Sequence, residues 1–135
     1  MSGVAVIGEL LNASAALLAA VPSDQIKGGG LAPGFKLNAI VVRSISTVHD
    51  QPLRRGATRR ATERVQVSGL AATYADQIQI LKLIRWACDG KRGNFAGVTD
   101  VSVLIGAAGP DFIHGEPSIF EGSQDFMVSY NEGTI

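Results

Sequence analysis

The residues with the clearest potential for acid–base or metal chemistry are two pairs of histidine and carboxylate side chains. His49 directly precedes Asp50, and His114 follows Asp111 by three positions. Both pairs lie in segments whose composition predicts loops, and a zinc site would also need a third ligand and positioned outer hydrogen bonds. The sequence supplies neither at a recognisable spacing. We therefore interpret both histidines as surface residues and predict no metal site, no cofactor and no catalytic residue.

Cys88 and a run of three glycines are the other candidates for chemistry, and each favours a structural role. The chain has one cysteine, so it can form no internal disulfide and no zinc site with several cysteines. Cys88 falls on the apolar face of a predicted helix without an evident base, which favours a buried thiol over a nucleophile. Gly28, Gly29 and Gly30 lack the lysine and the following helix of a phosphate loop, so we interpret them as a hinge. These observations predict that the protein is not an enzyme.

Charge is distributed unevenly along a chain whose formal net charge is zero. Residues 36–64 hold seven basic and two acidic residues, whereas residues 93–135 hold six acidic residues and no lysine or arginine. The basic residues of the first segment are Lys36, Arg43, Arg54, Arg55, Arg59, Arg60 and Arg64. The acidic residues of the second are Asp100, Asp111, Glu116, Glu121, Asp125 and Glu132. A neutral total gives no overall attraction to nucleic acid or to an anionic membrane.

Opposite charges on two segments of one molecule suit a head-to-tail contact between copies, which closes into a ring when the rotation permits. The alternative is that the two segments are neighbours within one fold and neutralise each other there. Trp86 is a further candidate, because it falls in the polar sector of a predicted helix and aromatic residues are common at interface hot spots. The interface candidates are Arg54, Arg55, Arg59, Arg60, Trp86, Asp111, Glu116 and Glu121.

Four of these arginines cluster in a predicted polar loop, residues 51–61, which also permits a nucleic-acid hypothesis. Clustered arginines neutralise phosphates, and aromatic residues usually add stacking on single-stranded bases. No aromatic residue lies between Phe35 and Tyr74, so the stacking part is missing. We interpret the loop as solvated surface or as a protein interface that is mobile in the isolated subunit. In a ring it would contact DNA only in passing.

Hydrophobic periodicity predicts the elements that must position these residues. Apolar residues at helical spacing predict a first helix over residues 3–20, and a short strand near residues 25–27 lies in the irregular connection that follows. The other predicted elements are a helix at 74–88, a long loop at 106–118 and strands at 39–48, 63–68, 98–105 and 125–130. Polar residues interrupt the first apolar segment and no basic residue precedes it, so we predict neither a signal peptide nor a membrane span.

The helix at 74–88 is the element with the clearest boundaries. Thr73 occupies the N-cap position with Asp76 three residues later, and Gly90 marks the end. At about 100° per residue, one face holds Tyr74, Ile78, Leu81, Ile84 and Cys88, with Ile80, Leu83 and Ala87 as a second apolar flank. Strand alternation points Val101, Val103, Ile105 and Tyr130 inward. The predicted monomer core is Val65, Val67, Ile78, Leu81, Ile84, Phe126 and Val128.

The order helix, strand, strand, helix, strand, strand predicts the fold class. It indicates an α+β fold with a mostly antiparallel sheet of about four strands and two main helices packed on one face. A chain of 135 residues with 46% apolar residues can form one hydrophobic core. We therefore predict a single domain over residues 1–135.

Five short motifs occur in an order that resembles the tail terminator, or tail completion, family of long-tailed bacteriophages. They are Arg64-Val-Gln-Val67, Ala72-Thr-Tyr-Ala75, Asp89-Gly90, Gly97-Val98 and Gln124-Asp-Phe-Met-Val-Ser-Tyr130. The resemblance spans residues 5–131, and none of the motifs is a catalytic signature. The arginine-rich loop departs from the family pattern, so the function of that loop can differ here.

The resemblance implies a virion protein that forms a hexameric ring. Such a ring caps the finished tail tube, stops its growth and presents a surface for head–tail joining. The implied partners are other copies of the chain, the tail tube protein and a head-completion or connector protein, with DNA only passing through. The implied location is the neck region of the virion tail, after assembly in the host cytoplasm. The alternatives are a small nucleic-acid-binding module that uses the arginine loop and another neck component, such as a head-completion protein.

Overall fold

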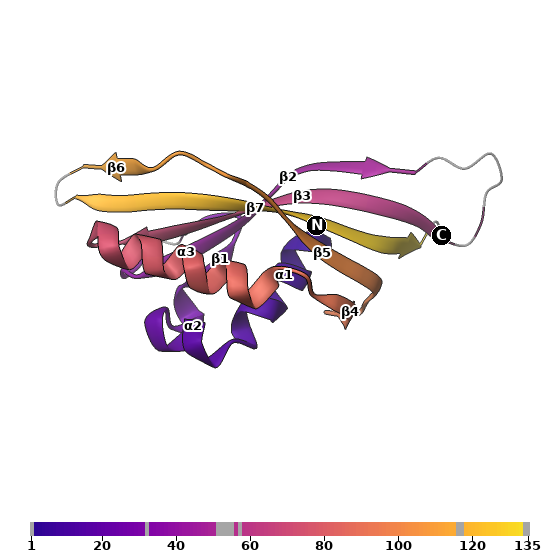
Figure 1. The fold of residues 1–135 in the computed structure, drawn as a ribbon, viewed down its shortest axis with the longest axis horizontal. Helices are drawn as coiled ribbons and strands as arrows, with labels where there is room; N and C mark the ends of the chain where they lie inside the picture. Colours follow the sequence, from indigo (N-terminus) through magenta and orange to yellow (C-terminus); the bar gives the residue numbers. More distant parts are fainter. Residues whose placement is uncertain (1, 32, 51–55, 57, 116–117, 134–135) are drawn as a thin grey trace.

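The computed structural model describes residues 2–31, 33–50, 56, 58–115 and 118–133. It has an α+β fold in which the helices lie on one side of a curled sheet (Figure 1). The helices are α1 (Ser2–Asn12), α2 (Ala15–Ala20) and α3 (Tyr74–Cys88). A 3-10 turn at Ser23–Gln25 follows α2. The strands are β1 (Ile26–Gly28), β2 (Ala39–His49), β3 (Thr58–Ala71), β4 (Arg92–Phe95), β5 (Val98–Ala108), β6 (Phe112–His114) and β7 (Ile119–Gly133).

The sheet is larger than the four strands predicted. It has seven strands in the order β1-β2-β3-β7-β5-β4, with β6 also paired to β7. Among the described strands only β1 and β2 pair in parallel, so the mostly antiparallel character is confirmed. The short strand predicted near residues 25–27 is confirmed as β1. The strands β4 and β6 were missed because they are short and mostly exposed, so they carry no alternating hydrophobic pattern.

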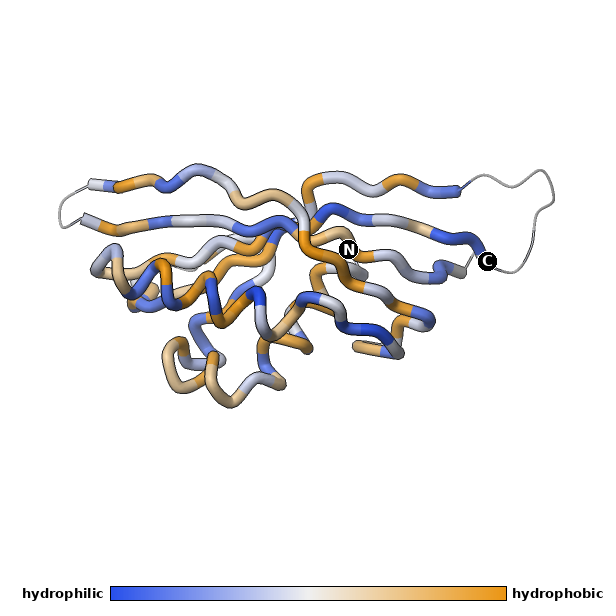
Figure 2. The backbone as a smooth tube through the Cα atoms, in the orientation of Figure 1, coloured by the Kyte–Doolittle hydropathy of each residue, from blue (hydrophilic) through white to orange (hydrophobic). Residues whose placement is uncertain are grey.

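The central strands β3 and β7 are also much longer than predicted and pair along their whole length, from Thr58 opposite Gly133 to Ala71 opposite Phe120. At one end the hairpin of β2 and β3 continues past the helices, whereas at the other end β6 and the start of β7 lie alongside the start of α3 (Figure 1). Hydrophobic residues concentrate in the helices and the adjoining middle of the sheet (Figure 2). The end of the sheet formed by the hairpin of β2 and β3 therefore extends beyond the part that the helices cover.

The first predicted helix is two helices. The chain leaves the helical conformation at Ser14, where the backbone is extended and the side chain accepts a hydrogen bond from the N–H of Leu17 at 3.3 Å. This contact caps the start of α2. The prediction of one helix over residues 3–20 is wrong because apolar spacing continues through the break, with Leu10, Leu11 and Leu17 all buried.

The boundaries of α3 are confirmed. The Thr73 side chain accepts a hydrogen bond from the N–H of Asp76 at 3.2 Å. Beyond the end of the helix, Gly90 has a φ of 72°, a left-handed conformation that glycine adopts without a steric penalty. The local signals in the sequence were therefore sufficient to place both ends.

The face that α3 buries differs from the predicted one. Ile78 and Tyr74 are 46% and 48% exposed, so placing Ile78 in the core was wrong. The buried side of α3 instead consists of Gln77, Ile80, Leu81, Leu83, Ile84, Ala87 and Cys88. The helix approaches the sheet over Gly69 and Gly122, which lie directly opposite each other on β3 and β7. A Cβ atom at Gly69 would come within 2.9 Å of the Ile80 side chain, and one at Gly122 would overlap the side chain of Gln77.

The rest of the predicted core is confirmed. Val65, Val67, Leu81, Ile84, Phe126 and Val128 are all at most 8% exposed, as are Val101, Val103 and Tyr130. Ile105 was expected to point inward but is 45% exposed. It pairs with Phe126 and so faces the helix side of the sheet, but it lies at the margin, in a pocket shared with Arg85, Trp86 and Asp89.

Candidate interaction surfaces

The arginines at the start of β3 pair with acidic residues of the same chain. Residues 58–61 belong to β3, so their assignment to a loop was wrong. Arg59 Nε lies 3.4 Å from the carboxylate of Glu132, and Arg60 Nη1 lies 3.3 Å from that of Asp100. The register of β3 against β7 causes the first contact, because it sets Arg59 directly opposite Glu132.

Arg64 makes a third ion pair of this kind. Its Nε donates to Asp125 Oδ2 at 2.8 Å, and the carboxylate of Asp125 is almost completely buried. Three basic residues of the first charged segment thus meet acidic residues of the second within one fold. For these residues, the alternative that the two charged segments neutralise each other within one fold is confirmed. The candidates Arg54, Arg55 and Glu116 lie outside the described residues.

The two candidate histidine–carboxylate pairs do not form. His49 Nδ1 lies 2.8 Å from Glu132 Oε2, and His114 Nε2 lies 2.8 Å from Glu121 Oε1. Asp111 instead accepts hydrogen bonds from the Tyr74 hydroxyl at 2.7 Å and from Gln77 at 3.1 Å. Within the described part of the chain, no group of three or more His, Cys, Asp or Glu side chains could hold a metal ion.

The hydrogen bonds to Asp111 fix its charge and its position. Those from Tyr74 and then Gln77 lower the pKa of the Asp111 carboxyl group, and the Asp111 contact raises the pKa of the Tyr74 hydroxyl. Both donors belong to the first turn of α3. Asp111 therefore remains ionised at neutral pH and fastens the segment before β6 to the N-terminal end of that helix.

Cys88 is buried, as predicted. Burial raises the pKa of its thiol to about 12, because a thiolate would lose its hydration there. The thiol therefore stays protonated at neutral pH, which opposes a nucleophilic role.

Glu63 is a buried charge that the sequence analysis missed. Its side chain accepts hydrogen bonds from the N–H of Gly3 at 3.1 Å and from the Tyr130 hydroxyl at 2.9 Å. Burial opposes ionisation, but these hydrogen bonds and one from Ser44 outweigh it and lower the pKa of Glu63. The signal was available, because the alternation that buries Val65 also places Glu63 on the same face. The carboxylate anchors the start of α1, where the helix dipole favours negative charge.

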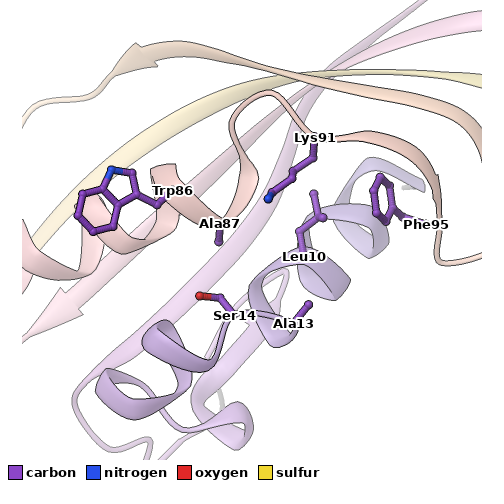
Figure 3. A pocket seen from close by; sticks show the side chains of 7 residues that line it. All are labelled: Leu10, Ala13, Ser14, Trp86, Ala87, Lys91 and Phe95. Atoms are coloured by element: carbon purple, nitrogen blue, oxygen red, sulfur yellow. The ribbon is translucent and has the colours of Figure 1, made fainter.

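Trp86 is 65% exposed on α3. The Nζ of Lys82 lies 4.7 Å from the centre of its ring, a cation–π contact across one helical turn. Trp86 borders two open pockets. The first is shared with Arg85, Asp89 and Ile105. The second lies between α1 and α3, where the Lys91 side chain points toward the space between Ala87 and Leu10 (Figure 3).

The strand β6 presents a second exposed apolar surface. Phe112 is 52% exposed and Ile113 is 66% exposed. One side of β6 pairs with β7, with Phe112 opposite Glu121 and Ile113 opposite Phe120. Of the interface candidates, Asp111 directly precedes β6 and Glu121 lies opposite Phe112 on β7, whereas Trp86 lies farther along α3.

A second basic group flanks Trp86 in the sequence, between the two charged segments. Lys82, Arg85, Lys91 and Arg92 lie on the second half of α3 and the residues that follow it. Among the described residues, none of the four has a carboxylate within ion-pair distance. Their spacing around Trp86 is a local signal that the sequence itself carries.

The comparisons with known proteins identify a fold. Neither a known family nor a curated protein matches the sequence, and no described helix is long and apolar enough to cross a membrane. A chain of a solved structure described as the virion of a native gene transfer agent particle superposes with a TM-score of 0.71 at 14% sequence identity. The match covers 96% of this chain and 94% of that one. The protein therefore shares its fold, over nearly its whole length, with a chain of a gene transfer agent virion.

Proposed function

We propose that the protein is a structural component of a phage-like virion, and specifically a tail terminator. The observation that carries the proposal is the fold shared with a gene transfer agent virion chain along 96% of the sequence. The order of five motifs, which resembles the tail terminator family, supports the finer assignment. In this proposal, copies of the chain form a ring, a hexamer in the family it resembles. The ring binds the open end of the tail tube and removes the site for further subunit addition.

The proposed function depends on binding through complementary surfaces and involves no catalysis. The side chains that could take part in catalysis have structural contacts instead. Asp111 is hydrogen-bonded to α3, His114 contacts Glu121, and Cys88 is buried in the core. The partners would be other copies of the chain, the tail tube protein and a head-completion or connector protein. DNA would pass through the ring, and the protein would end in the neck region of the virion after assembly in the host cytoplasm.

The internal ion pairs weigh against the nucleic-acid alternative. Arg59, Arg60 and Arg64 already face carboxylates of the same chain, so their charges are less available to phosphates. Phosphate binding would weaken steeply with salt, so measuring DNA binding at two salt concentrations separates the two functions.

A tube-capping assay tests the proposal. Purified protein would be added to a polymerising tail tube protein from the same phage or prophage, and tube lengths and ends measured by electron microscopy. We expect shorter tubes with a ring at one end, and rings in the protein alone at high concentration. Tubes of unchanged length with bare ends would overturn the terminator assignment. Binding to the head connector without binding to the tube would indicate a head-completion protein instead.

A further inference from the structure

The exposed patch around Trp86 combines an apolar centre with a basic rim. Trp86 and Ile105 are 65% and 45% exposed and border the same pocket. The charged residues beside Trp86 are Lys82, Arg85 and Lys91, together with Asp89. An aromatic anchor inside a charged rim is the usual composition of a protein interface. We name these residues the Trp86 surface.

The hairpin of β6 and β7 has the complementary composition. Phe112 and Ile113 form its exposed apolar part, and Asp111 and Glu121 flank them. No lysine or arginine occurs anywhere from residue 93 to the end of the chain. The acidic side chains here contact Tyr74, Gln77 and His114. No lysine or arginine in the described part of the chain forms an ion pair with Asp111 or Glu121. We name residues 111–114 and 119–121 the β6 arm.

The β6 arm of a subunit cannot reach the Trp86 surface of that same subunit. The hydrogen bonds of Asp111 fasten the arm to Tyr74 and Gln77 at the first turn of α3. Trp86 lies twelve residues after Tyr74, which is about 18 Å along the helix axis. Any contact between the two surfaces must therefore join two molecules.

We propose that the β6 arm of one subunit docks on the Trp86 surface of a second copy of this chain. Phe112 and Ile113 would pack beside Trp86, and the carboxylates of Asp111 and Glu121 would face Lys82, Arg85 and Lys91. The two surfaces differ, so the contact is head-to-tail and leaves one of each exposed until a ring closes. The inference rests on the proposed self-assembly, and it replaces the arginines of β3 with the basic residues around Trp86 as the positive partner.

Cysteine cross-linking tests the contact directly. The native Cys88 is buried, so it does not compete with engineered surface thiols. Arg85→Cys places a thiol on the Trp86 surface, and Ile113→Cys places one on the β6 arm. Mixing the two variants under mild oxidation should give disulfide-linked dimers at least tenfold faster than mixing Arg85→Cys with Val48→Cys. Val48 lies on β2 and is 67% exposed, against 66% for Ile113, so this control pair has comparable accessibility.

The outcomes separate this inference from the proposed function. Rings that form while both mixtures cross-link equally slowly would overturn the docking and leave the ring intact. Cross-linking of Arg85→Cys with itself at the faster rate would also overturn it, because that indicates a two-fold contact. A parent protein that stays monomeric and caps no tube would remove both the ring and this contact.

A charge exchange gives a second, independent measurement. Glu121→Lys and Arg85→Glu should each weaken assembly by about tenfold or more while the folded subunit keeps its circular dichroism spectrum. Combining Glu121→Lys with Arg85→Glu in one chain restores opposite charges across the interface and should recover most of the assembly. Additive losses in the double variant would mean that the two residues do not meet.

Discussion

The two long sides of α3 carry similar apolar residues in different environments. Leu81 and Ile84 are 8% and 0% exposed, whereas Ile78 and Trp86 on the other side are 46% and 65% exposed. Hydrophobicity does not separate the two groups. The paired glycines Gly69 and Gly122 do, because they let the backbones of β3 and β7 approach one side of the helix. One side of α3 therefore packs against the sheet within the subunit, and the other side remains exposed.

Truncating the buried side should produce the largest loss of stability. Leu81→Ala removes a side chain packed over the sheet and should lower the free energy of unfolding by about 2–5 kcal/mol. Ile78→Ala, one turn away on the exposed side, should cost less than about 1 kcal/mol, since surface changes have small effects. Urea denaturation of both variants would measure the difference. Equal losses would mean that the two sides of α3 are not distinguished by burial.

Adding a side chain at the paired glycines under α3 should have the next largest effect. A methyl group at Gly122 would overlap the Gln77 side chain and approach Leu81. Gly122→Ala should therefore destabilise the subunit by about 1–3 kcal/mol, the usual cost of overpacking. Gly8→Ala on α1 is the matched control, because a Cβ atom there meets nothing within 4 Å. Thermal melts would compare the stability of the two variants. A loss in Gly8→Ala as large as that in Gly122→Ala would contradict the idea that α3 needs a glycine at position 122.

The Tyr74–Asp111 hydrogen bond at the exposed side should contribute less, and its contribution should depend on pH. The folded pKa of Asp111 is lowered, so the stabilisation is present above the unfolded pKa of about 3.9 and is lost as the pH falls through the folded value. Tyr74→Phe should be less stable than the parent at pH 7. The difference should disappear in strong acid, as measured by denaturation at both pH values. A difference that is independent of pH would show that the hydrogen bond is not its source.

Trp86→Ala should have the smallest effect on the folded subunit and a clear effect on assembly. The exposed indole contributes little to the core, so the free energy of unfolding should change by no more than about 0.5 kcal/mol. If the Trp86 surface is an interface, ring formation should weaken in sedimentation experiments, because aromatic anchors carry much of the binding energy. Ile78→Ala serves again as the control, since it removes exposed apolar surface from the same helix. Unchanged assembly in Trp86→Ala would end the interface role of this residue.

Features that depend on neighbouring residues in the chain could be predicted. The cap at Thr73, the stop at Gly90 and the alternation of Val65 and Val67 are local signals, and the structure confirms each of them. The α+β class and the mostly antiparallel sheet followed from the order of these elements. Two further features also have local signals in the sequence. They are the cap at Ser14, which divides the first helix, and the alternation that buries Glu63.

The remaining features join residues far apart in the sequence, and only the tertiary structure decided them. The helix α3 packs where Gly69 lies opposite Gly122 on the paired strands β3 and β7, and this close packing sets which side of the helix is buried. The register of β3 against β7 likewise brings Arg59 to Glu132 and so pairs its charge within the subunit. Helical periodicity identifies apolar positions but not the surface that receives them. The partner of a side chain depends on strand pairing over more than fifty residues, which no local pattern encodes.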